Sequence, residues 1–237
     1  LIRNYLQAVV GSWAASLNGQ AAPVLDVQTR TRFNEANDSH YYLVPGVIVT
    51  IMTMIGALLT SLVMAREYER GTLESLFVTP VGSGEILTAK AATNFLLGMV
   101  SLAISMIFAA FVFDIPIRGS LILLLAVSAL FLIVALGLGL VISTATKNQF
   151  LACQFAIMGT FMPALMLSGF LYDILNMPPA VRAITYIIPA RYYVTLLQTL
   201  FLAGDIPSVI IPCCITLGVF AVVLMGIARL KAPKSLE

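Results

Sequence analysis

Five long stretches without a charged side chain or a histidine constrain this sequence more than any other feature. Each stretch holds at least 23 residues, whereas about 20 mostly apolar residues suffice for a helix to cross the hydrocarbon core of a bilayer. A buried helix of a soluble protein is usually shorter and keeps a polar face. The sequence therefore predicts five transmembrane helices, at about 44–65, 91–113, 119–146, 150–172 and 206–228.

The composition excludes several classes of protein. Apolar residues make up 60% of the 237 residues and charged residues only 10%, against roughly 25% charged residues in an average soluble domain. A single soluble core of this size could not bury so much apolar surface. A soluble enzyme and a disordered protein are therefore excluded. A nucleic-acid binder is excluded as well, because the net charge is only +2.

The charged residues all lie outside the predicted spans. Proton-coupled transporters and voltage sensors place ionisable side chains inside the membrane, so their absence here weighs against both classes. Milder polar side chains do occur within the spans. Asn94 and Gln154 are candidates for lining a substrate pathway, and hydrogen bonding between helices is the alternative.

The sequence offers no residues for catalysis, nucleotide binding or metal binding. It contains no G-x-x-x-x-G-K-[ST] loop that could hold the phosphates of ATP. His40 is the single histidine, and Cys153, Cys213 and Cys214 do not have the spacing of metal ligands. We therefore predict a chain that is not catalytic by itself and that holds neither a cofactor nor a metal.

The distribution of basic residues predicts an orientation in the membrane. Lys and Arg are more than twice as dense in 66–90, 147 and 229–237 as on the opposite side, and the positive-inside rule places the denser side in the cytoplasm. The C-terminus is then cytoplasmic, and residues 1–40 are outside. Residues 1–17 have helical spacing and 24–34 alternate like a strand, so we predict part of an extracytoplasmic domain at 1–40.

A charged amphipathic motif follows the first predicted span. Residues 66–80 read REYERGTLESLFVTP, and helical spacing separates a broad apolar face from Glu67, Arg70 and Glu74. Gly71 indicates a bend, because glycine is unfavourable inside a helix. We predict a short surface helix at about 66–78, which is either simply solvated or docks a cytoplasmic partner.

The segment before the last span is too polar to cross the membrane, yet it is rich in large apolar residues. Pro178 and Pro179 are typical of a helix start, and Pro189 interrupts the pattern. We predict two short re-entrant helices at about 174–203 that dip into the outer leaflet. They would serve as an interfacial plug or as an external gate.

Three motifs resemble those of ABC-2 type transporter permeases. REYERGTLESLFVTP resembles the signature that follows the second transmembrane helix of that family. ALGLGLVISTATKNQ at 135–149 resembles the end of its fourth helix, and LSGFLYDILNMPPAVRAITYIIPARYYV at 167–194 resembles its loop between helices five and six. The motifs occur in the family's order, and the resemblance covers about 26–231.

The resemblance implies an all-α polytopic membrane protein with an ABC-2 type transmembrane domain at 41–231. The five spans correspond to the second to sixth helices of a six-helix permease, so the chain is expected to be truncated at its N-terminus. Re-entrant extracytoplasmic helices and a remnant of a small α/β extracytoplasmic domain complete the expected fold.

The resemblance also implies partners and a location. A cytoplasmic ABC ATPase subunit would hold ATP and magnesium, and a second permease copy or a paralogue would complete a dimer. The expected location is the bacterial inner membrane, and a periplasmic adaptor is a further expected partner. The expected branch of the family is the drug-type one, which has a large extracytoplasmic domain.

Two groups of functional residues follow from the resemblance. The residues expected to couple the permease to the ATPase are Glu67, Tyr68, Glu69, Arg70, Thr72, Glu74 and Leu76. The residues expected to form the extracytoplasmic gate are Ser168, Gly169, Asn176, Pro178 and Pro189.

The expected function is outward movement of an amphipathic substrate, such as a drug or a lipid, driven by ATP that a separate subunit hydrolyses. A non-transporting membrane anchor or assembly factor for a cytoplasmic ATPase is the alternative. A passive channel is a third hypothesis, although nothing in the sequence predicts a selectivity filter.

Overall fold

The computed structural model describes residues 10, 11, 13, 40–70, 83–115 and 117–231. The chain divides into two compact units, Leu1–Asp38 and Ser39–Glu237, and the helices described below all belong to the second unit. The predicted strand at 24–34 lies outside the described residues. So does most of the predicted surface helix, including Thr72, Glu74 and Leu76.

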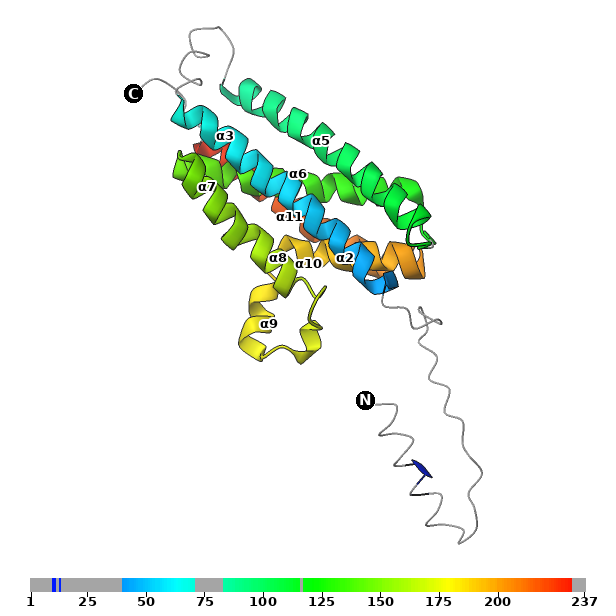
Figure 1. Ribbon diagram of the computed structural model, residues 1–237. Coiled ribbons are helices and arrows are strands. Elements are labelled where there is room, and N and C mark those ends of the chain that lie inside the picture. The colour runs from blue at the N-terminus through cyan, green and yellow to red at the C-terminus, as the bar shows by residue number, and fades with distance from the viewer. Residues whose placement is uncertain (1–9, 12, 14–39, 71–82, 116, 232–237) are drawn as a thin grey trace. The chain divides into compact units, whose positions relative to one another are not determined.

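Every regular element among the described residues of the second unit is helical (Figure 1). The α-helices are α2 (His40–Thr53), α3 (Thr60–Glu69), α5 (Ser83–Phe111), α6 (Leu121–Thr146), α7 (Gln149–Ala156), α8 (Met162–Leu167), α9 (Pro179–Thr185), α10 (Pro189–Gln198) and α11 (Pro207–Lys231). Shorter turns join some of them: the π turns η1 (Met54–Leu59), η2 (Ile157–Phe161) and η4 (Thr199–Ala203), and the 3₁₀ turn η3 (Ile174–Asn176).

Five helical runs in the described residues are long and apolar enough to cross a membrane, and this number confirms the prediction. They are Tyr42–Glu69, Ala89–Phe111, Leu121–Thr146, Gln149–Leu167 and Pro207–Leu230. The first run joins α2, η1 and α3, and the fourth joins α7, η2 and α8.

Two ends of these runs differ from the predicted boundaries. The first helical run continues to Glu69 instead of ending near 65, so residues 66–69 extend α3 rather than start a separate surface helix. The fourth run ends at Leu167 instead of near 172. Gly169 has a φ of +89°, a left-handed conformation that glycine adopts without steric cost and that interrupts a right-handed helix.

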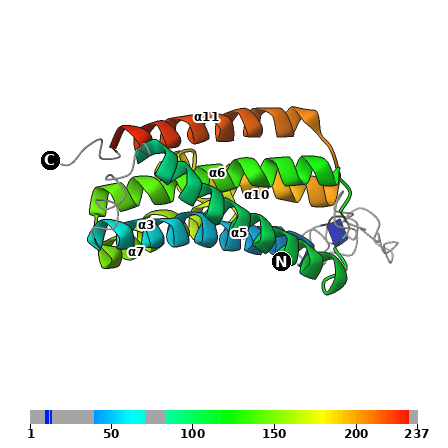
Figure 2. The same cartoon turned by 90° about the horizontal axis from the view of Figure 1, so that it is seen from above.

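The helix α6 lies at the centre of the second unit. It contacts α3, α5, α7, α10 and α11, and Figure 2 shows it between α11 and α3. Its side chains Leu124, Phe131 and Leu132 are almost fully buried in the main apolar core. A second, smaller cluster joins α3, α5, α6 and α11 through Met64, Ala91, Leu140 and Ala228.

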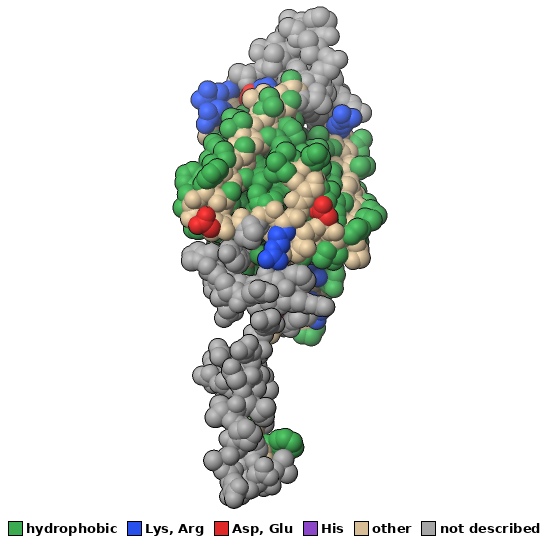
Figure 3. Space-filling view, turned by 90° about the vertical axis from the view of Figure 1, so that its right-hand side faces the viewer, with side chains coloured by type: hydrophobic (Ala, Val, Ile, Leu, Met, Phe, Trp, Pro, Cys, Tyr) green, Lys and Arg blue, Asp and Glu red, His purple; other side chains and the backbone are tan. Residues whose placement is uncertain are grey.

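The helices α5 and α11 direct large apolar side chains outward. On α5 these include Leu97, Val100, Ile104 and Phe111, each more than half exposed. Figure 3 shows a face on which hydrophobic side chains fill the middle, whereas charged side chains lie towards its ends. Such a surface is expected of helices that face lipid.

Two π turns lie against each other. The turn η1 interrupts the first helical run, η2 interrupts the fourth, and the two are in contact. Pro163 is the second residue of α8, which follows η2. Proline lacks a backbone N–H donor, and its ring clashes with the carbonyl four residues earlier. Wider π turns often mark functional positions within helices, and a cavity lies beside this pair.

Candidate functional site

The end of α3 carries the part of the predicted coupling motif that the structure describes. Glu67 forms an ion pair with Lys90 of α5. Glu69 Oε2 accepts a hydrogen bond from the backbone N–H of Gln149, at an N–O distance of 3.0 Å. The two described glutamates of this motif therefore contact neighbouring helices of the same chain.

The remaining described residues of the motif face elsewhere. Tyr68 is half-buried, whereas Arg66 and Arg70 are exposed. The helix α3 ends at Glu69, and the backbone N–H of Arg70 still donates to the carbonyl of Arg66 at 3.0 Å. The ATPase-coupling role of these residues stays a prediction.

The predicted gate residues fall into two places. Ser168, Gly169, Asn176 and Pro178 lie in the connection between α8 and α9, whereas Pro189 begins α10. The hydroxyl of Tyr42, on α2, donates a hydrogen bond to the carbonyl of Gly169 at 2.7 Å. The start of the first helical run is thus tied to the end of the fourth.

Individual gate residues differ in exposure. Ser168 is buried, and a Cβ atom on Gly169 would lie 3.0 Å from the end of the Ile174 side chain. Asn176 and Pro178 are exposed. Ser168 and Gly169 therefore lie in the packed part of this connection and Asn176 and Pro178 on its surface; opening and closing stays a prediction for all of them.

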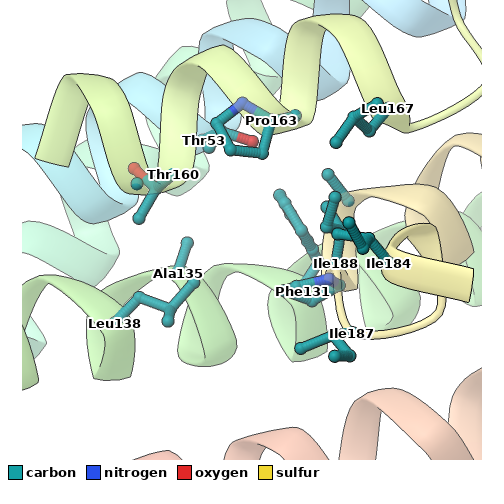
Figure 4. Close-up of a pocket in the computed structure, with 14 residues that line it drawn as sticks. Thr53, Phe131, Ala135, Leu138, Thr160, Pro163, Leu167, Ile184, Ile187 and Ile188 are labelled. Carbon is teal, nitrogen blue, oxygen red and sulfur yellow. The ribbon is translucent and has the colours of Figure 1, made fainter. Parts of the chain in front are cut away.

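A cavity of about 330 Å³ lies between α6, the η2–α8 segment and the connection between α9 and α10. Figure 4 shows Ala135 and Leu138 on one side, Thr160 and Pro163 on the other, and Ile184, Ile187 and Ile188 at one end. The lining residues are Thr53, Phe131, Ala135, Leu138, Gly159, Thr160, Pro163, Ala164, Leu167, Ile184, Ile187, Ile188, Pro189 and Ala190.

The chemistry of the cavity favours uncharged apolar groups. Its two polar side chains both donate within their own helices: Thr53 Oγ1 to the carbonyl of Val49 at 2.8 Å, and Thr160 Oγ1 to the carbonyl of Ala156. Neither hydroxyl hydrogen is then directed to a ligand. The volume lies at the lower end of the range of small-molecule pockets. The cavity could therefore hold the uncharged aliphatic or aromatic part of an amphipathic ligand, whereas a charged group of that ligand would have to lie outside the cavity.

Asn94 and Gln154, the two predicted pathway residues, are not brought together. Asn94 is buried on α5, and its Nδ2 donates to Thr60 Oγ1 on α3 at 3.1 Å. Gln154 is exposed on α7. Neither residue lines the cavity of about 330 Å³, and their role in a pathway stays a prediction.

Tyr193 of α10 packs against α6 beside this cavity, through contacts with Phe131 and Ser128. Tyr193 is completely buried, its ring stacks on Phe131 at 4.1 Å between centroids, and its hydroxyl donates to Ser128 Oγ at 2.8 Å. Burial raises the pKa of the Tyr193 hydroxyl, although the hydrogen bond with Ser128 opposes that shift. The hydroxyl is therefore a neutral donor near pH 7.

Arg191 is held within the same part of the chain. Its guanidinium group hydrogen-bonds to Thr185 and lies 4.0 Å from the centre of the Tyr186 ring. The hydroxyl of Tyr192 donates to the carbonyl of Tyr186 at 2.9 Å. These contacts join α10 to the end of α9 and so fix the connection that closes one end of the cavity.

The sequence pattern does not reveal the cavity, because the lining of the cavity comes from segments far apart in the chain. In the sequence, Thr53 and Thr160 are polar residues within apolar stretches, and Pro163 is a residue that disfavours a regular helix. Nothing in the linear pattern placed them opposite Leu138 or Ile187.

Comparisons with known proteins match this chain to a family of transporters and to individual permeases. Residues 1–230 match the family described as ABC-2 family transporter protein. The chain is 45% identical, over its full length, to the probable multidrug ABC transporter permease YbhS of Escherichia coli K12. It is 31% identical over 84% of its length to the probable multidrug ABC transporter permease YbhR, and 28% identical over 99% to the inner membrane transport permease YhhJ, both of the same strain.

These relatives are longer than the chain. It spans 64% of YbhS, 54% of YbhR and 63% of YhhJ.

Proposed function

Because the chain belongs to the ABC-2 family of transporter proteins, we propose that it is the permease part of an ATP-driven exporter that moves an amphipathic substrate outward. The observation that carries this proposal is an uncharged cavity among helices that are apolar enough to span a membrane. The chain itself is a non-catalytic, multi-pass membrane subunit, and its sequence has no phosphate-binding loop for ATP.

The proposal includes the partners that such a subunit requires. ATP and magnesium are bound by a separate cytoplasmic ATPase subunit, and a second permease copy or a paralogue completes a dimer. The charge distribution supports a cytoplasmic end of α3 and a cytoplasmic C-terminus in the bacterial inner membrane. A periplasmic adaptor stays a prediction from the resemblance alone.

The function is tested with the permease and its co-purified ATPase, reconstituted in lipid vesicles. We expect ATP-dependent movement of an amphipathic fluorescent probe, either ethidium or a fluorescently labelled phosphatidylethanolamine. The pair of probes separates a drug-like substrate from a lipid. ATPase binding without movement of either probe would instead support the anchor or assembly factor. Probe movement without nucleotide would support a passive channel.

Filling the cavity is expected to block transport. In Leu138→Trp the larger ring occupies space that the substrate's apolar part would use, and we expect roughly tenfold slower probe transport, as for a loss of about 1.4 kcal/mol of binding. The matched control is Ile122→Trp, because Ile122 lies on the same helix but is 80% exposed. Equal transport by the two variants, with both folded, would exclude the cavity from the substrate path.

A further inference from the structure

Glu67 and Glu69 extend to opposite sides of α3. Residues two positions apart on an α-helix are separated by about 200° around its axis. Glu67 accordingly reaches Lys90 on α5, and Glu69 reaches Gln149 at the start of α7. One turn of α3 thus contacts both α5 and α7.

The contact with α5 is an ion pair that is partly shielded from water. The side chains of Lys90 and Glu67 are 25% and 22% exposed. A pair at this depth is less weakened by solvent and salt than a fully exposed one. Directly beside it, Ala91 packs in the small cluster that also holds Met64 of α3. The ion pair therefore adds a charged contact to an existing apolar one.

The contact with α7 is a helix cap supplied from a distant segment. The first backbone N–H groups of a helix have no partner within the helix, and the helix dipole favours an anion there. Asn148 satisfies the N–H of Leu151 with its own side chain at 3.1 Å. The carboxylate of Glu69 satisfies the N–H of Gln149. Removing Glu69 would leave that N–H without this acceptor.

Tight packing of small residues supports the same junction. Ser61 and Ala65 of α3, and Ala152 of α7, are fully buried. Ser61 Oγ lies 3.4 Å from the carbonyl oxygen of Ala152. The two helices therefore approach closely just before the point at which Glu69 caps α7.

We propose that Glu67 and Glu69 are positioning residues that join the ends of α3, α5 and α7 into one mechanical unit. A displacement that an ATPase imposes on the chain after Arg70 then moves all three helices together. This inference rests on the proposed function, and it gives the two glutamates a role within the permease instead of a contact surface for the ATPase. Arg66 and Arg70, which are exposed, remain available for a partner.

The first experiment separates assembly from coupling in the complete permease–ATPase complex. Glu67→Lys places two positive charges together, and we expect the ATPase to co-purify normally while the amount of ethidium moved per ATP falls about fivefold or more. The exchange variant Glu67→Lys/Lys90→Glu restores the attraction and is expected to recover most of this ratio. Arg229→Glu, an exposed charge reversal on α11, is the matched control and should transport normally.

The second experiment measures the cap on α7 without any transport assay. Amide hydrogen exchange in the first turn of α7 should accelerate about fivefold in Glu69→Ala, since loss of one capping acceptor costs roughly 1 kcal/mol. Glu69→Gln keeps an oxygen acceptor, so its exchange rate should lie between those of the unmodified protein and Glu69→Ala. Exchange in α11 should not change in either variant.

The outcomes distinguish this inference from the proposed function. Normal coupling in Glu67→Lys, or an exchange variant as defective as the single one, would overturn the positioning role and leave the exporter proposal intact. Unchanged exchange of α7 in Glu69→Ala would overturn the cap. A complete absence of nucleotide-driven movement by the unmodified complex would overturn the proposed function, and the coupling role with it, whatever the exchange data show.

Discussion

Replacing Gly139 with valine is expected to prevent the protein from reaching its folded state. A Cβ atom at this position would lie 2.6 Å from the carbonyl oxygen of Ala57, 2.9 Å from Cβ of Thr60 and 3.1 Å from the backbone nitrogen of Ser61. Two of these three atoms belong to the backbone of the facing helical run and cannot rotate away. The central helix α6 would have to separate from η1 and α3, at a cost of about 3 kcal/mol or more.

The measurement is the yield of monodisperse protein in detergent, together with its thermal unfolding temperature. Gly218→Val is the matched control, because a Cβ on Gly218 of α11 would meet no atom within 4 Å. The control should also gain slightly from the loss of a flexible glycine. Similar yields and similar unfolding temperatures for the two variants would contradict the close contact between α6 and the first helical run.

The number of spans could be predicted because a bilayer leaves little choice. A helix crossing lipid must satisfy all its backbone hydrogen bonds internally and present apolar side chains along its whole length. The five uncharged stretches meet this requirement, so they are visible in the sequence. The ends could not be predicted as well, since apolar content does not report where a helix stops. Residues 66–69 remain helical despite three charges, and α8 stops at Leu167 within an apolar stretch.

The candidate site, like the fold, could be predicted only in part. The resemblance to the family motif singles out Glu67 and Glu69, but the spacing of the motif alone could not show which neighbours α3 has on each side. Asn94 stood out as polar within a span, yet its partner Thr60 depends on how α5 crosses α3. Direction around a helix follows from the sequence, whereas the identity of the facing helix depends on tertiary packing.

Replacing Tyr193 with alanine is expected to be the most destabilising change outside the spans. The side chain is completely buried, stacks on Phe131 and donates to Ser128. Both partners lie on α6, so one side chain fixes α10 against the central helix. Truncation of a buried aromatic ring costs about 3–5 kcal/mol. Because Phe131 also lines the cavity, we expect loss of probe transport in whatever protein still folds.

The variant Tyr193→Phe separates the contribution of the stacked ring to stability from that of the hydroxyl. It keeps the stacking and removes one hydrogen bond, so the cost should be only about 1 kcal/mol, and transport should persist.

The same variant tests the raised pKa of Tyr193. An acid that is harder to ionise in the folded state than in the unfolded one stabilises the fold least at high pH. Between pH 8 and about pH 11, above the ordinary tyrosine pKa near 10, the unmodified protein should therefore lose more stability than Tyr193→Phe. Equal losses would show that this hydroxyl is open to solvent, and a large destabilisation in Tyr193→Phe would assign the anchor to the hydrogen bond instead of the stacked rings.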